Sequence, residues 1–151
     1  MALTPDGRKA FSFGEDGVRV WNLDTGREER MLTIHVDEVS VVTVTPDGRR
    51  AVSGGKDGIL LVWNLDTGAA VSTLTGHAGC VEALALTPNE WRAISGGDDR
   101  TLRLWELNIG GELGRVALDA AVTCVAVVPG QPLRVVAGDT TGTVYCLEWV
   151  E

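Results

Sequence analysis

One motif recurs along this chain at an interval of about 42 residues, and this repetition restricts the possible folds more than any other feature. Trp21, Trp63 and Trp105 are each 42 residues apart, and the matching position in the last copy is Leu147. Prolines and glycines recur at nearly the same interval. A period of this length is typical of structural repeats that stack and bury their apolar faces against one another.

Each copy of the motif consists of short apolar segments separated by turn residues. In the second copy these segments cover residues 39–45, 50–53, 59–63 and 70–74. Glycine, proline and aspartate stand between the segments and favour tight turns. No 11-residue window has the apolar stripe of an amphipathic helix. The sequence therefore predicts an all-β chain of antiparallel strands.

The central segments are apolar at successive positions, as in Leu60-Leu61-Val62 and Leu84-Ala85-Leu86. A sheet with one face in water would alternate apolar and polar residues along each strand. These segments instead predict sheets that are covered on both faces, as the blades of a β-propeller are.

The repeats resemble the WD-repeat family over essentially the whole chain. The resemblance implies an all-β fold, a WD-type β-propeller with four repeats per chain. It also implies a buried tetrad in each blade, formed by a histidine, a serine or threonine, an aspartate and a tryptophan. Such a network, when every polar group has a partner, fixes one geometry. The matching residues are His35, Ser53, Asp57 and Trp63 in the second repeat, His77, Ser95, Asp99 and Trp105 in the third, and Ser12, Asp16 and Trp21 in the first.

The fourth repeat departs furthest from the family pattern. It places Asp119, Ala137, Thr141 and Leu147 at the four tetrad positions. We therefore expect no such tetrad in this blade, which would rely on apolar packing.

We expect one propeller unit over residues 1–151, with repeats at about 1–34, 35–76, 77–118 and 119–151. The first repeat lacks most of its inner strand, and the last lacks its outer strand. Four blades in an open row would expose apolar faces and strand edges at both ends. We predict that a second chain completes the ring, as a homodimer of eight blades. The alternative is a fragment of a larger propeller with no separate function.

Composition narrows the class of partner. The chain has 151 residues and a formal net charge of −8, so an acidic surface should repel nucleic acid. It has no apolar run long enough to span a membrane, and we expect no leader peptide and no membrane partner. It has three cysteines, which is an odd number, and their spacing does not fit a disulfide framework. Reduced thiols and a cytoplasmic location are expected.

No pattern in the sequence predicts catalysis, and we expect no catalytic residues, no metal and no cofactor. Residues 53–58 are rich in glycine but lack the spacing of a phosphate-binding loop. His77 and Cys80 form one close pair without the further ligands that zinc needs or the third group that orients a catalytic base. A hydrolase in the central channel is the enzyme alternative.

The family resemblance places partner binding on the narrow face around the channel, here called the channel face. Its candidate residues are Glu15, Glu38, Ser40, Lys56, Cys80, Glu82, Asp98, Thr123 and Thr140. Because acidic residues outnumber the single lysine, a basic or polar partner surface is expected. Trp91 is a possible exposed contact outside this face.

The repeats also resemble the C-terminal repeats of bacterial multidomain signalling ATPases. That resemblance implies a non-catalytic scaffold or ligand-sensing module that binds a protein or peptide.

Overall fold

The computed structural model describes residues 1–33, 35–89 and 91–150, so the expected repeat boundaries at 34 and 151 lie outside the described residues. The described residues form fifteen strands in four antiparallel sheets and contain no helix. The prediction of an all-β chain is confirmed. No helix in the described ranges could cross a membrane.

The four sheets follow one another along the chain and are called blades 1 to 4. Blade 1 contains β1 (Ala2–Leu3), β2 (Lys9–Gly14), β3 (Gly17–Asn22) and β4 (Arg27–Leu32). Blade 2 contains β5 (Val39–Val44), β6 (Arg50–Gly55), β7 (Leu60–Asn64) and β8 (Ala70–Leu74). Blade 3 contains β9 (Val81–Leu86), β10 (Arg92–Gly97), β11 (Thr101–Glu106) and β12 (Gly111–Ala117). Blade 4 contains β13 (Val122–Val128), β14 (Leu133–Asp139) and β15 (Val144–Trp149).

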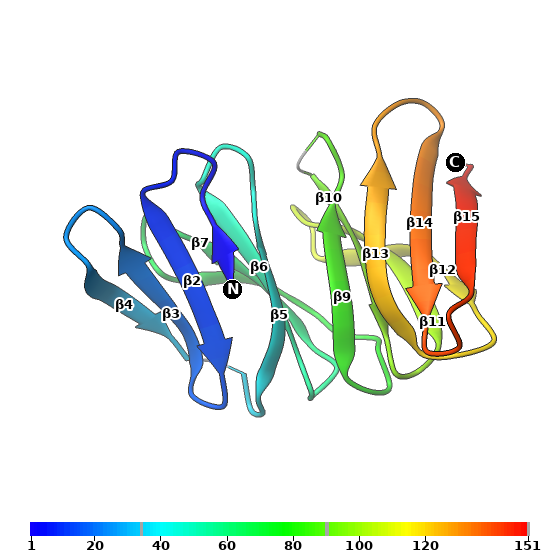
Figure 1. The fold of residues 1–151 in the computed structure, drawn as a ribbon, viewed down its shortest axis with the longest axis horizontal. Coiled ribbons are helices and arrows are strands. Elements are labelled where there is room, and N and C mark those ends of the chain that lie inside the picture. Colours follow the sequence, from blue (N-terminus) through cyan, green and yellow to red (C-terminus); the bar gives the residue numbers. More distant parts are fainter. Residues whose placement is uncertain (34, 90, 151) are drawn as a thin grey trace.

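Within each blade, every strand pairs with the strand that precedes or follows it in sequence. The inner strands β5, β9 and β13 lie next to one another. The blades therefore form a row, with blade 1 at one end and blade 4 at the other (Figure 1). The two end blades are the smaller ones: β1 has two residues, and blade 4 has three strands.

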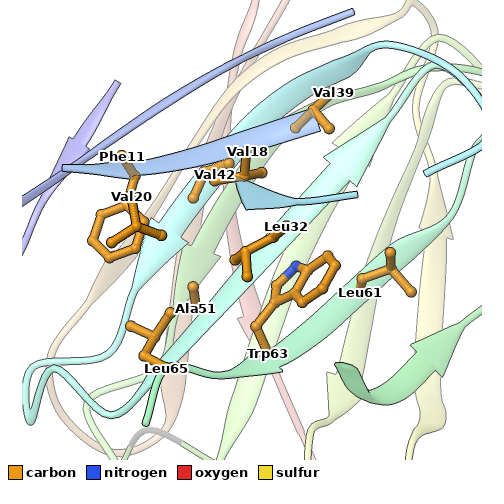
Figure 2. Packing of buried hydrophobic residues seen from close by; sticks show 10 residues of the cluster. All are labelled: Phe11, Val18, Val20, Leu32, Val39, Val42, Ala51, Leu61, Trp63 and Leu65. Carbon is orange, nitrogen blue, oxygen red and sulfur yellow. The ribbon is translucent and has the colours of Figure 1, made fainter. Parts of the chain in front are cut away.

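The apolar core lies between the blades and is divided into three clusters, one for each pair of neighbours. Figure 2 shows the cluster between blades 1 and 2. In β7, Leu61 and Trp63 belong to this cluster, whereas Leu60 and Val62 belong to the cluster between blades 2 and 3. Alternate residues of a strand point to opposite faces, and here both faces are apolar. This arrangement accounts for the apolar runs in the central segments.

Glycines on the second strand of a blade allow the next blade to approach closely. Val81 of blade 3 packs against Gly54 of blade 2, where an added Cβ would lie 2.7 Å from Val81 Cγ1. Val122 of blade 4 packs in the same way against Gly96 of blade 3. A side chain at either glycine would push the two blades apart.

We predict that Gly54→Ala lowers the free energy of unfolding by about 1–3 kcal/mol, because the added methyl overpacks a closed interface. Gly14→Ala is the matched control, since an added Cβ at Gly14, at the end of β2, meets no atom within 4 Å. That control should be neutral or slightly stabilising. Urea unfolding of both variants measures the difference, and equal effects would contradict the role of the glycine.

Candidate functional site

The structure brings the four tetrad positions of blade 3 into one hydrogen-bonded chain. Trp105 Nε1–H donates to Ser95 Oγ at 2.7 Å. Ser95 Oγ lies 2.6 Å from His77 Nε2, and His77 Nδ1 lies 2.9 Å from Asp99 Oδ2. The hydroxyl accepts from the indole and donates to Nε2, so the proton on Nδ1 points to the carboxylate. This series of hydrogen bonds runs from Trp105 on β11, the third strand, to His77 in the segment before the inner strand β9.

Blade 2 contains the same chain at equivalent positions. Trp63 Nε1–H donates to Ser53 Oγ at 2.8 Å, and Ser53 Oγ lies 2.8 Å from His35 Nε2. His35 Nδ1 lies 3.2 Å from Asp57 Oδ2. Both serines are fully buried, so the tetrads hold their polar groups away from water.

The tetrad aspartate is placed by the turn that contains it. Asp99 Oδ1 accepts from the backbone N–H of Thr101 at 3.1 Å, a bond that closes an Asx turn before β11. Its other oxygen accepts from the N–H of Ala78 at 3.0 Å. One carboxylate therefore connects the turn between β10 and β11 to the segment that leads into β9.

The surroundings of Asp99 and His77 set the protonation state of both side chains. Burial alone would raise the pKa of Asp99, but bonds from Ala78, Thr101 and the His77 ring lower it from 3.8 to about 2. Burial lowers the pKa of His77 from 6.5, and the neighbouring Asp99 only partly opposes this shift. The ring is neutral at pH 7, and the hydrogen bonds, more than a charge on the ring, keep Asp99 ionised.

Blade 1 contains part of the tetrad. Trp21 Nε1–H donates to Ser12 Oγ at 2.8 Å. Asp16 is exposed and pairs with Arg19 at 3.4 Å. The structure thus brings Ser12 and Trp21 together, whereas Asp16 pairs with Arg19.

Blade 4 does not rely on apolar packing alone, so that expectation was wrong. Asp139 is buried and accepts from the backbone N–H and the hydroxyl of Thr141, at 2.9 and 2.7 Å. It also accepts from Thr143 N–H and from the Tyr145 hydroxyl. Asp139 aligns with Gly55 in blade 2, where an added Cβ would lie 2.8 Å from His35 Nδ1. The Asp139 carboxylate comes from two residues before Thr141, which stands at the usual tetrad aspartate position. It therefore fills the space that the histidine and aspartate of the tetrad occupy in blade 2.

The channel face forms where each inner strand begins beside a turn of its own blade. A backbone bond recurs there: Lys56 N–H donates to Glu38 O, Asp98 N–H to Cys80 O, and Thr140 N–H to Ala121 O. Lys56 also forms an ion pair with Glu38. These bonds fix the turn against the inner strand in blades 2, 3 and 4.

Serine and threonine side chains on this face bond to backbone. Ser40 Oγ donates to Val81 O and links blade 2 to blade 3. Thr123 Oγ1 donates to Gly138 O at 3.2 Å within blade 4. Glu15 is exposed on blade 1.

Cys80, Glu82 and Asp98 gather on the channel face of blade 3, with their potential ligand atoms within 4.8 Å of one another. Among the described residues this is the one group that could hold a metal ion. Glu82 and Asp98 are exposed. Burial raises the pKa of Cys80 to about 11, and its bond to Glu82 adds to the shift. The thiol is thus protonated at neutral pH, which makes it a poor ligand and a poor nucleophile.

His77 has no free ring nitrogen to act as a base for Cys80, because Ser95 and Asp99 occupy both. A nucleophile–base pair needs the two side chains to bond to each other. The structure therefore supports a structural role for His77.

Trp91 lies apart from the channel face, on the turn between β9 and β10, and is 48% exposed. The guanidinium of Arg50 stacks on its ring at 5.5 Å from the centroid. Arg50 also donates to Asn108 Oδ1 at 2.9 Å. Trp91 thus bridges blades 2 and 3 and still exposes part of its indole.

We predict that Ser95→Ala lowers the free energy of unfolding by about 2–4 kcal/mol, because it leaves two buried groups, the Trp105 N–H and His77 Nε2, without partners. Ser12→Ala removes a single bond from the half-buried Trp21 and should cost about 1 kcal/mol or less. Chemical denaturation followed by tryptophan fluorescence compares the two. A smaller loss for Ser95→Ala would contradict the buried network.

We predict that the protein loses stability as the pH falls, over two ranges. Below about 6.5 the unfolded state binds a proton at His77 before the folded state does. From about 4 down to 2 the unfolded state protonates Asp99 first. The charge of Arg103 also lowers the pKa of His77, and the charge of Glu112 raises it. Urea unfolding from pH 7 to pH 3 measures the loss. Asp99→Asn should flatten the acidic part of the profile, and an unchanged slope would refute the assignment.

The comparisons with known proteins agree with this geometry. Residues 26–64 match the family model of the WD domain, G-beta repeat, and residues 77–149 match that of the TEP-1 C-terminal beta-propeller. The crystal structure of RRP9 WD40 repeats superimposes with a TM-score of 0.88 at 22% sequence identity, over 95% of this chain and 46% of that chain. This chain thus spans less than half the length of that one. No curated protein matches the chain. Residues 26–64 thus carry WD-repeat sequence, and the described residues have the fold of several consecutive blades of a WD40 β-propeller.

Proposed function

We propose that this protein is a non-catalytic interaction scaffold or ligand sensor that binds a basic protein or peptide segment on its channel face. The observation that carries the proposal is the cluster of exposed carboxylates on blade 3, Glu82 and Asp98, beside the Glu38–Lys56 pair of blade 2. The charge of Lys56 is already paired, so the face retains a negative potential. A negative face steers and orients a positive partner.

The rest of the face suits binding better than chemistry. Its inner strands and turns are fixed by backbone bonds, and its histidine is held inside the tetrad. WD40 propellers typically serve as protein-interaction scaffolds, and the fold supports the same role here. The resemblance to the C-terminal repeats of bacterial signalling ATPases supports a sensing role of this kind.

The cysteines and the open row of blades bear on the location of the protein and on its assembly. The three cysteines are free, which supports a reducing compartment such as the cytoplasm. The blades form part of a ring, and a second copy of the chain is the partner that would complete the platform.

The test is the binding of an oligoarginine peptide, measured by calorimetry at low and at physiological salt. We predict that Glu82→Lys combined with Asp98→Lys weakens binding at least about tenfold, because two attractive charges become repulsive. Binding to the unaltered protein should also weaken as salt rises.

The control combines Asp24→Lys with Asp66→Lys, which changes the net charge by the same amount. These residues lie in the turns between β3 and β4 and between β7 and β8, at the opposite end of the strands from the channel face. The control should bind the peptide nearly as well as the unaltered protein. Equal losses in both variants would mean that net charge alone attracts the peptide, and the proposed site would be wrong.

A further inference from the structure

Blade 1 exposes at its open end a face that the other blades cover. Leu23 is 46% exposed on this face. Its counterparts are Leu65 in blade 2, which is 5% exposed, and Leu107 in blade 3, which is 1% exposed. Both counterparts are buried because the preceding blade packs on them. The face of blade 1 therefore has the residues of a covered face but has no blade upon it.

Blade 4 exposes the opposite kind of face. Val144 on β15 is 66% exposed, whereas its counterpart Leu60 in blade 2 is fully buried against blade 3. Cys146 and Cys124 are also exposed on this blade. Figure 1 shows that blades 1 and 4 stand at the two ends of the row. The open ends thus differ in kind: one is the face that a preceding blade covers, and the other is the face that covers a following blade.

Blade 3 shows how a charged side chain is tolerated under a covering blade. Arg103 is 5% exposed and faces the same side as Trp105, toward blade 2. Its guanidinium pairs with Glu112 at 2.6 Å and with Asp99 at 3.4 Å. Because these bonds satisfy the charge within blade 3, blade 2 can cover it with apolar residues.

Blade 1 has the same arrangement without the cover. Arg19 occupies the position of Arg103 and pairs with Glu28 at 2.9 Å and with Asp16 at 3.4 Å. Its side chain is 39% exposed. The charge on this open face is already paired, as the charge of Arg103 is beneath blade 2. Because its arginine is already paired, the open face of blade 1 can be covered by an apolar face, as blade 3 is covered by blade 2.

We propose that blade 4 of one copy docks on the open face of blade 1 of a second copy, and that the reciprocal contact closes a ring of two chains. This inference develops the ring completion within the proposed function and is independent of the acidic channel face. The contact repeats the order seen inside the chain, where each blade covers the next one in sequence.

A second copy is the occupant that the internal contacts favour. The three contacts within the chain all join the same two kinds of face, and each copy has one unpartnered face of each kind. Two copies related by a twofold axis would satisfy both faces in two equivalent contacts.

The experiment measures solution mass by light scattering over a dilution series, with Val144→Asp and Leu23→Lys as separate variants. The unaltered protein should show a constant mass of twice 16.0 kDa. Each variant places a charge in both contacts, and its dimer should dissociate at least about tenfold more readily. Circular dichroism confirms that each variant folds.

Mixing the two variants tests the head-to-tail order. In a mixed dimer one contact keeps two native faces, and the other contains an introduced lysine and an introduced aspartate. The mixture should therefore recover dimer at concentrations where each variant alone is monomeric. Val71→Asp is the matched control, because Val71 is an exposed valine on the edge strand β8 of blade 2, away from both open ends. It should remain dimeric.

Four results would overturn the proposal. A monomeric unaltered protein would show that the faces do not meet, and a mass that rises beyond the dimer would show contacts that fail to close. A dimer that survives Leu23→Lys would point to pairing through blade 4 alone, for example along the free edge of β15. Variants that stay monomeric when mixed would exclude the head-to-tail contact. None of these results affects peptide binding by the channel face, which is measured separately.

Discussion

Burial between neighbouring sheets is the constraint on which this structure depends. No sheet has a core of its own, since every apolar cluster takes residues from two blades. The covered faces must therefore match in shape, which glycines such as Gly54 and Gly96 permit by admitting a valine from the next blade. The open faces of blades 1 and 4 follow from the same rule, because a row of blades always leaves two faces without neighbours.

Polar networks fix each blade internally while the apolar faces join the blades. The tetrads of blades 2 and 3 connect the third strand to the segment before the inner strand, so they hold three neighbouring strands of one sheet in register. Among the described residues, no buried side-chain nitrogen or oxygen lacks a partner. Blade 4 reaches the same condition with Asp139 and Tyr145, without a histidine. The space near the inner strand thus requires a satisfied carboxylate more than it requires one particular residue.

The repeat was sufficient to predict the fold class and most strands, because turn residues and apolar segments are local signals. The expected segment 70–74 coincides with β8 (Ala70–Leu74). The Asp139 network was not predictable by alignment, because its carboxylate comes from a position that is glycine in the other complete repeats. The available signal in the sequence was an aspartate close to a tyrosine on the next strand, since Tyr145 pairs with Ala137, two residues before Asp139. The grouping of Cys80 with Glu82 and Asp98 depends on side-chain directions that spacing does not determine.

The location of the cores has a consequence for how such a chain can change over time. Because every blade presents the same two kinds of face, a gene that gains or loses one whole repeat still encodes faces that match. A partial repeat, by contrast, removes half of two cores at once. The first two copies share the segments TPDGR and VWNLDTG without any difference, which is the pattern that duplication of whole units produces. The smallest unit that carries a complete core is a pair of blades, and growth by single blades adds one core at each step.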